Sequence, residues 1–192
     1  MIGSYTVISD VGESLVSLLR DLMPTSLIAS PEQIGLVSPA ETGNIRLGLF
    51  LYSIRENGDF RQTTMITRGK NELQYPPMSL QLYYLVTAYS KAELASRAAD
   101  EALILGKAME ILFDHSVIRS KYLRGTLAQS NEEPKIAFDN LHTDVLLRLW
   151  NFPNVPYRPS LSYAVGPILL NSNRTKPIKR VSEVNFHVKG SL

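Results

Sequence analysis

Residues 75–113 read YPPMSLQLYYLVTAYSKAELASRAADEALILGKAMEILF, and this stretch decides the fold. Two prolines lead into a segment with apolar residues at alternate positions, which is the pattern of a β-strand. Apolar residues then recur at every third or fourth position, which is the pattern of one long helix. The stretch contains no nucleophile beside a base, no cluster of metal ligands and no phosphate-binding loop. It is built for packing, and it indicates a protein that works through its shape and its contacts.

The alternation divides the side chains of the expected strand, residues 78–89, between two faces. One face carries Leu80, Leu82, Tyr84, Val86 and Ala88, and the other carries Gln81, Tyr83, Leu85, Thr87 and Tyr89. The expected helix has a seam that should face the core, formed by Leu94, Ala98, Ala102, Leu105, Met109 and Leu112. Small residues dominate the first half of this seam, so the helix can approach a neighbouring element closely.

Upstream of this stretch, the sequence predicts a helix, a short strand and a long strand. The helix ends before Pro24, and its apolar stripe consists of Ile8, Val11, Leu15, Leu18 and Leu22. A short strand is expected at 34–37, within a loop over 27–39. Residues 44–55, NIRLGLFLYSIR, are apolar at both alternating sets of positions, which is typical of a strand in the centre of a sheet.

A hairpin is expected after that strand. Residues 56–59 read ENGD, and Asn-Gly tolerates the positive φ angles that a tight turn requires. Residues 60–67 would then form the returning strand, and residues 68–75 an exposed loop.

Downstream of the long helix, the chain is more polar and more broken. Residues 114–133 hold one short apolar piece around Ile118 and a candidate for low order, GTLAQSNEE. A short strand at 135–139 and a helix from Asp139 or Asn140 to Trp150 follow. Three prolines predict an extended connector, and residues 160–170 form the last expected strand.

Helices alternate poorly with strands in this order, which argues against a doubly wound sheet. We expect an α+β fold in which a mainly antiparallel sheet packs against the long helix and the N-terminal helix. The chain has 192 residues, enough for one domain that buries roughly 70% of its unfolded surface. No repeat or linker divides it, so we expect one domain over residues 1–173 and an arm over residues 174–192.

Composition narrows the class of protein further. The apolar fraction of 44% and the charged fraction of 20% are those of an ordinary globular protein. The chain has no cysteine, so it can form neither a disulfide nor a thiolate metal site, which fits a cytoplasmic protein. The N-terminus has no signal peptide pattern, and no stretch approaches the ~18 apolar residues of a membrane span.

The residues that could carry chemistry are scattered. His115, His142 and His187 fall in separate expected elements, and no catalytic or metal-binding motif is present. Gly43 and Gly48 stand at the start of an expected strand rather than a helix, so the segment between them is not expected to form a phosphate-binding loop. Glu132 and Glu133 are interpreted as a solvated charge run. We therefore expect no catalytic, metal or cofactor site.

The tyrosines and the tryptophan admit two interpretations. Tyr75, Tyr83, Tyr84 and Tyr89 surround one strand, and an aromatic strand face can stack on nucleic-acid bases. That function requires interleaved basic residues, and only Lys91 is near, so core packing is favoured. Trp150 is interpreted as a core or interface plug.

The C-terminal arm is basic. Residues 174–192 contain five basic residues and one acidic residue and so carry +4, which leaves −2 for residues 1–173 of a chain whose net charge is +2. The arm is either a solvated tail or a segment that docks on an acidic partner by adding a strand to its sheet. Nucleic acid is disfavoured as the partner, because so few charges in one arm give little specificity. The candidate partner-binding residues are Arg174, Lys176, Lys179, Arg180 and Phe186.

Three blocks of the sequence resemble a known family. They read PPMSLQLYYLVTAYS from residue 76, GKAMEILFDHSVI from residue 106, and LLRLWNFPNVPYRPSLSYAVGPILL from residue 146. In this order they are similar to the cap, or tail-terminator, proteins of phage-tail-like extracellular contractile injection systems, of the Photorhabdus virulence cassette and antifeeding prophage type. Together with the N-terminal helix and the strand at 44–55, the resemblance covers nearly the whole chain.

The resemblance implies a structural role. Six copies would form a ring on the end of the inner tube distal to the baseplate, stop its growth and tie the last sheath layer to it. The implied partners are further copies of this chain, the inner tube protein and the sheath protein, with no membrane. Some members carry a further C-terminal domain, so we expect this chain to represent the ring-forming part alone. From the residues alone, a soluble α+β adaptor that recognises an acidic protein or nucleic-acid surface remains the alternative.

Overall fold

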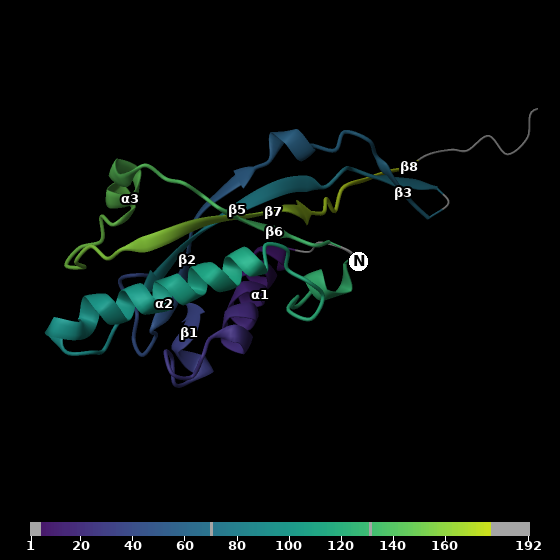
Figure 1. The fold of residues 1–192 in the computed structure, drawn as a ribbon. Coiled ribbons are helices and arrows are strands. Elements are labelled where there is room, and N and C mark those ends of the chain that lie inside the picture. The colour runs from purple at the N-terminus through teal and green to yellow at the C-terminus, as the bar shows by residue number, and fades with distance from the viewer. Residues whose placement is uncertain (1–4, 70, 131, 178–192) are drawn as a thin grey trace, which may run out of the picture.

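The computed structural model describes residues 5–69, 71–130 and 132–177, which form two β-sheets and three α-helices (Figure 1). The α-helices are α1 (Val7–Leu22), α2 (Leu94–Asp114) and α3 (Thr143–Leu149). The strands are β1 (Ile34–Leu36), β2 (Leu47–Glu56), β3 (Ile66–Arg68), β4 (Glu72–Gln74), β5 (Met78–Ala88), β6 (Lys135–Phe138), β7 (Ser160–Leu170) and β8 (Thr175–Pro177).

The larger sheet has five strands in the order β1-β2-β5-β7-β6. β1 pairs with β2 in parallel, and the other pairs in this sheet are antiparallel. β5 lies at its centre because it is apolar on both faces, and it runs from the pair Glu56–Leu80 to the pair Leu47–Ala88 along β2. The predicted α+β class with a mainly antiparallel sheet is confirmed.

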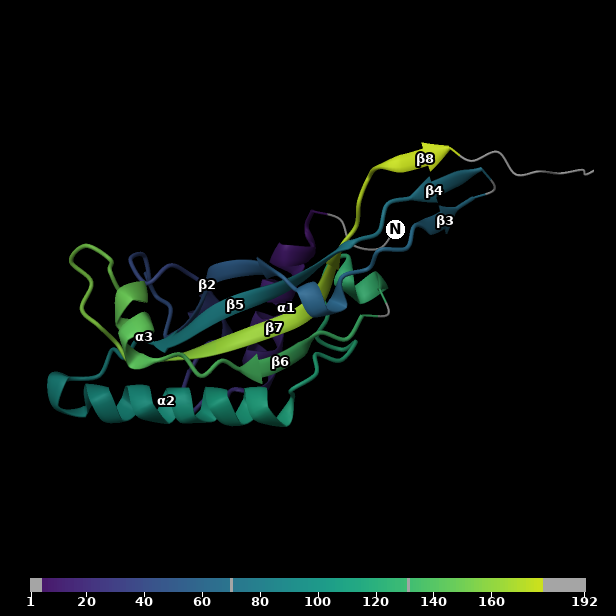
Figure 2. The ribbon, with the colours of Figure 1, turned by 90° about the horizontal axis from the view of Figure 1, so that it is seen from above.

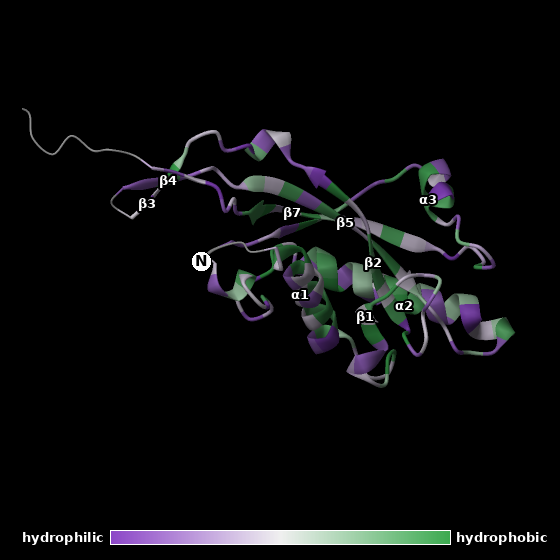
Figure 3. Ribbon diagram, turned by 180° about the vertical axis from the view of Figure 1, so that it is seen from behind, coloured by the Kyte–Doolittle hydropathy of each residue, from purple (hydrophilic) through white to green (hydrophobic). Residues whose placement is uncertain are grey.

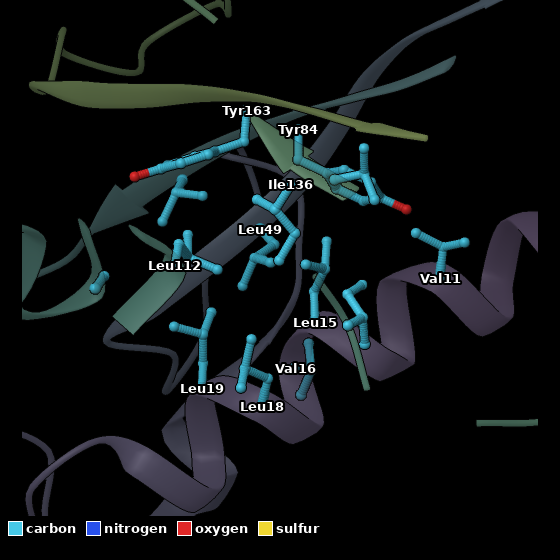
Figure 4. Close-up of a cluster of buried hydrophobic side chains, with 14 of the residues drawn as sticks. Val11, Leu15, Val16, Leu18, Leu19, Leu49, Tyr84, Leu112, Ile136 and Tyr163 are labelled. Atoms are coloured by element: carbon cyan, nitrogen blue, oxygen red, sulfur yellow. The ribbon is translucent and has the colours of Figure 1, made fainter. Parts of the chain in front are cut away.

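Two helices cover one face of this sheet and enclose the main core. α1 contributes Val11, Leu15 and Leu19, β5 contributes Leu82 and Tyr84, and all five are buried. Figure 4 shows side chains from α1, β2, β5, β6, β7 and α2 meeting in this cluster. Hydrophilic positions are interleaved with hydrophobic ones along α1 in Figure 3, as expected for a helix with one buried side.

α3 and the proline-containing connector lie over the opposite face of the sheet, at one end (Figures 1 and 2). Trp150 is 5% exposed there, and its ring lies edge-on to the Phe152 ring with the two centroids 6.2 Å apart. Phe152 in turn meets Phe50 of β2 at 5.8 Å. Trp150 is therefore a packing residue, as the sequence predicted.

The hairpin predicted at residues 56–59 does not form. The Asn57 N–H donates to the Ser79 carbonyl oxygen at 2.8 Å, so residue 57 still follows β5. Asn57 has φ of −91° rather than a positive φ, and its side chain accepts a hydrogen bond from the Asp59 N–H in a short 3₁₀ turn. Residues 61–64 are all polar, so the predicted returning strand offers no alternating apolar face. β2 pairs instead with β5.

β3 and β4 form at Ile66–Arg68 and Glu72–Gln74, where the end of a returning strand at residue 67 and then a loop over 68–75 were predicted. Gly69 has φ of +69° between the two strands, a conformation that favours glycine. β8 then pairs with β4, which gives a small sheet in the order β3-β4-β8 beyond one end of the large sheet (Figure 2). Residues 160–170 are therefore not the last strand.

The segment predicted to have low order packs in part against α1. The Asp10 carboxylate accepts hydrogen bonds from the Thr126 N–H at 2.8 Å and from its hydroxyl at 2.6 Å. Leu127 is buried beside them. Residues 125–130 are consequently anchored to the first turn of α1.

The seam predicted for α2 is mostly wrong. The side of the helix that faces the core carries Glu101, Ile104, Leu105, Ala108, Ile111 and Leu112. Only Leu105 and Leu112 of the predicted seam are buried, whereas Leu94 is 82% exposed and Met109 is 42% exposed. The helix is apolar on two sides, and the pattern could not tell which side packs on the sheet.

Candidate interaction surfaces

The start of the basic arm is built into the small sheet. The Arg174 carbonyl oxygen accepts a hydrogen bond from the Tyr75 N–H at 3.0 Å, and the Arg174 guanidinium lies 4.2 Å from the centroid of the Tyr75 ring. Lys176 pairs with Leu73 of β4, and its side chain is on an exposed strand. Lys179, Arg180 and Phe186, the other candidate partner-binding residues, lie outside the described residues.

A depression of about 420 Å³ with a mixed polar and apolar lining lies where the two sheets meet. Its lining includes charged groups from Glu56, Arg61 and Arg174, together with Tyr75 and Leu170. The Gln74 side-chain amide donates to the Ser172 carbonyl oxygen at 2.5 Å, which fixes the chain between β7 and β8. The structure therefore holds the first residues of the arm in one direction, away from α2 (Figure 2).

A second depression follows one side of α1. Glu13, Arg20, Asp21 and Arg124 are among the residues that line it. The Lys121 ammonium donates to the Asp21 carboxylate at 2.7 Å, and this hydrogen bond lowers the pKa of that carboxyl.

A third depression includes Glu132 and Glu133 in its lining. Glu133 is exposed as predicted, whereas Glu132 is half-buried and accepts a hydrogen bond from the Leu169 N–H at 3.3 Å, and burial raises the pKa of Glu132.

The fourth depression is apolar. We call it the β2 edge groove, because it opens where β1 ends and β2 continues without a partner on that side among the described residues. Its volume is about 520 Å³, and none of the described residues that line it is charged. The lining consists of Tyr5, Ile8, Ser9, Leu36, Val37, Ser38, Leu49, Phe50, Leu51 and Tyr84.

A buried ion pair joins α2 to the end of β5 and to the connector. The Glu101 carboxylate accepts hydrogen bonds from the Arg158 guanidinium and from the Ser90 N–H, the latter at 3.1 Å. Glu101 is only 8% exposed. Beside it, Arg46 and Asp100 form a second ion pair at 2.5 Å. Neither pair could be predicted from the sequence, because the partners in each pair are more than 50 residues apart and no short motif links them.

The polar groups on the opposite face of the sheet form one closed network. The Tyr52 hydroxyl donates to the Asp139 carboxylate at 3.0 Å, and the Ser162 hydroxyl donates to the same oxygen at 3.0 Å. Burial raises the pKa of Tyr52 to about 12. A tyrosine that holds its proton so firmly is poorly suited to proton transfer near neutral pH. This network joins β2 to β7 across the sheet.

The histidines do not assemble a site within the described residues. His115 ends α2, with its Nδ1 atom 3.2 Å from the Ile111 carbonyl oxygen. His142 precedes α3, and His187 lies outside the described residues. In the part of the chain that the structure describes, no group of three or more His, Cys, Asp or Glu side chains is placed to hold a metal ion. None of the helices in that part is both long and apolar enough to cross a membrane.

These surfaces belong to a fold that other proteins share. The family model described as the Pvc16 N-terminal domain matches residues 10–183. The chain belongs to this family. The match takes in both helices of the core, both sheets and the first part of the basic arm.

Two solved structures resemble this member of the Pvc16 N-terminal domain family. One is described as the sheath/tube terminator of an extracellular contractile injection system, PVC, in the extended state. It has a TM-score of 0.64 and 17% identity, and the match covers 96% of this chain and 64% of that chain. The other is described as the tube-terminating cap of the anti-feeding prophage. It has a TM-score of 0.65 and 16% identity, with 94% of this chain and 61% of that chain covered.

At these identities the structural likeness establishes a shared fold. The chain spans between three fifths and two thirds of the length of the solved chains it matches. No curated protein sequence matches the chain.

Proposed function

We propose that this chain is a cap subunit of a contractile injection system, where it ends the inner tube and anchors the last layer of sheath. The observation that carries this proposal is the family match over residues 10–183. It is supported by the fold shared with a sheath/tube terminator and with a tube-terminating cap. The role is structural rather than enzymatic.

The partners in this proposal are further copies of the chain, the inner tube protein and the sheath protein. The copies form a ring, with six subunits on the tube end. A ring requires heterologous contacts, so each subunit presents two different lateral surfaces to its two neighbours. Assembly takes place in the cytoplasm, and the subunit then becomes part of an extracellular contractile injection particle.

We assign ring formation and sheath binding to different parts of the chain. Residues 1–173 form the ring subunit, and residues 174–192 form an arm that reaches the sheath. Arg174, Lys176, Lys179, Arg180 and Phe186 are the arm residues that we assign to sheath binding. The pairing of β8 with β4 ties residues 175–177 of the arm to the ring subunit. Positive charge next to a strand suits docking on an acidic sheet edge.

Removal of this chain from a particle-producing strain tests the proposal. We expect tubes of uncontrolled length or particles with detached sheath in negative-stain images, and full recovery when the intact chain is supplied. Particles of normal length with anchored sheath would contradict the proposed function.

Truncation after residue 177, which keeps β8 in the small sheet, tests the rest of the arm separately. We expect capped tubes of normal length whose sheath is no longer held at the cap end. Sheathed and normally capped particles from this truncated chain would exclude a sheath-binding arm while leaving the cap function standing.

A further inference from the structure

The side of α2 that points away from the core is mainly apolar and bare. We call it the outer face of α2, and its apolar residues are Ala95, Ala99, Ala102, Leu103, Gly106, Met109 and Phe113. All seven residues are exposed. Phe113 is 80% exposed and Leu103 is 61% exposed, which are high values for large apolar side chains on a folded protein. A helix that is apolar on both sides is expected to be covered on both sides.

The packing of this chain does not account for the outer face. Gly106 stands in the interior of α2, where glycine is less favourable than alanine. No described atom of the neighbouring structure lies within 4 Å of the place that a Cβ would occupy there. No contact among the described residues therefore requires a glycine at position 106. A partner surface that approaches the helix backbone closely would use it.

Charges are also rare on this side of the helix. Glu110 lies on the outer face one turn from Gly106, and its carboxylate is paired with the Lys107 ammonium at 2.5 Å. The surface that covers the outer face should accordingly be mainly apolar and carry no acidic residue.

The β2 edge groove has these properties. It is concave, and its lining residues carry no charge, whereas each of the other three depressions described above includes charged residues. Leu36 is 42% exposed at its rim, and Tyr5 is 88% exposed. The outer face of α2 and the β2 edge groove would both stay exposed to water in an isolated chain. The free-energy cost of this exposure rises with the apolar area.

The outer face and the groove lie on different sides of the molecule. Figure 2 shows α2 along one margin, beyond β6, and β2 along the opposite margin, in agreement with the strand order β1-β2-β5-β7-β6. A convex apolar face on one side and a concave apolar groove on the other allow head-to-tail contact between identical copies. An isologous pair would leave either all the helix faces or all the grooves uncovered.

We propose that the outer face of α2 in one copy packs into the β2 edge groove of the next copy around the ring. This inference rests on the proposed cap function and identifies the lateral surfaces of the ring subunit. Phe113, Leu103 and Met109 are the anchor side chains, and Gly106 is the point of closest backbone approach.

The area of the proposed contact indicates whether it can form between free copies or only on the tube. The outer face is about 30 Å long and about 10 Å wide, or about 300 Å². A standard stable interface buries about 800 Å² from each partner. The contact is therefore too small to hold two free copies together, and it forms when the tube end sets copies side by side. We expect the free chain to be monomeric.

Cross-linking in assembled particles tests the contact directly, because the chain has no cysteine of its own. A chain with both Ala102→Cys and Leu36→Cys should give a ladder of multimers with a short bis-maleimide. A mixture of the two single variants should give dimers only. A matched control with Leu36→Cys and Glu72→Cys, the latter exposed on β4 of the small sheet, should give no ladder.

Two results would overturn the proposal. One is the absence of a ladder from the Ala102/Leu36 pair in particles whose caps are visible by electron microscopy. The other is dimer formation by Ala102→Cys alone, which would indicate that two α2 helices face each other. Both leave the proposed cap function intact, whereas normal particles without this chain would contradict that function itself.

Gly106 provides a test that separates assembly from folding. Gly106→Arg should keep or raise the melting temperature, because the added side chain has free space and replaces a poor helix former. It should nevertheless reduce the fraction of capped particles by at least about tenfold, because it places a charge at the centre of the contact. Gly106→Ala should leave capping unchanged. Normal capping by the folded Gly106→Arg variant would exclude this face as the contact.

Discussion

The ion pair between Glu101 and Arg158 should contribute strongly to stability, because it fixes α2 on the sheet. The Glu101 carboxylate is 10% exposed as a side chain and the Arg158 side chain is 23% exposed. Removing one partner of a buried ion pair costs about 3–5 kcal/mol, and the water that reaches Arg158 places this pair near the lower limit, at about 3 kcal/mol. Glu101→Ala also leaves the Ser90 N–H without its acceptor.

Urea unfolding of the purified chain, followed by circular dichroism, measures this loss. With a slope of about 2 kcal/mol per molar urea for a chain of this size, Glu101→Ala should lower the unfolding midpoint by about 1.5 M. The exposed pair Lys107–Glu110 on the same helix provides a matched control. Glu110→Ala should change the unfolding free energy by less than about 0.5 kcal/mol.

A double-mutant cycle shows whether the two residues act together. Arg158→Ala in the Glu101→Ala background should cost clearly less than in the native chain, with a coupling of about 1–3 kcal/mol. If the two single changes add to within about 0.5 kcal/mol, the pair is not the anchor of α2 and the argument from its burial is wrong.

Three further predictions concern single residues. Leu82→Ala, at a fully buried position of β5, should lower the unfolding free energy by about 3 kcal/mol, and a loss below about 1 kcal/mol in urea unfolding would contradict its central place in the core. Because burial raises the pKa of Glu132, its protonated form favours the folded state and this contribution is lost as the pH rises through the raised pKa. Glu132→Gln should therefore raise the melting temperature at pH 7, with a difference that shrinks towards pH 4, and a pH-independent difference would refute the assignment. Gly125 has φ of +57°, and a Cβ there would lie 2.2 Å from an Asp10 carboxylate oxygen. Gly125→Ala should cost at least about 2 kcal/mol by the same unfolding assay, whereas Gly58→Ala, where space is open and φ is not positive, should cost little.

The parts of the fold that follow from local pattern could be predicted from the sequence. The N-terminal helix, the strands at 78–89 and 160–170 and the proline connector all appear where their patterns place them. In each case the residues that set the pattern also make the main contacts of the element, so local preference and tertiary packing agree.

The hairpin at Asn57-Gly58 failed for the opposite reason. The dipeptide favours a tight turn, but a hairpin requires two strands with matching faces, and the polar residues 61–64 cannot supply the second. The small sheet was missed because its three strands are only three residues long, and one of them lies some 100 positions from its partner. Pairing between such distant short segments leaves no signal in a local window.

The candidate site was the least predictable part. The basic composition of the arm singled out Arg174 and Lys176 as candidates for partner binding. The structure adds that both residues lie beside β4 in the small sheet. The ion pair of Glu101 with Arg158 could not be predicted, because a glutamate in a helix is expected to lie in water unless its partner is known.

The predicted core-facing seam of α2 is mostly exposed, and the reason bears on how the helix is used. The prediction chose the side with the most alanine and methionine, and that side is largely exposed. Hydrophobic periodicity reports every surface that is shielded from water, and it does not distinguish burial within one chain from burial between chains. Residues such as Ala102 and Met109 therefore satisfied the pattern of a core without facing one. The solvent side of α1 carries charges such as Glu13 and Arg20, as expected for a helix side that faces water, whereas the outer face of α2 carries Glu110 alone. Its mainly apolar character agrees with the head-to-tail contact that we propose, in which two different sides of each copy pack against its neighbours.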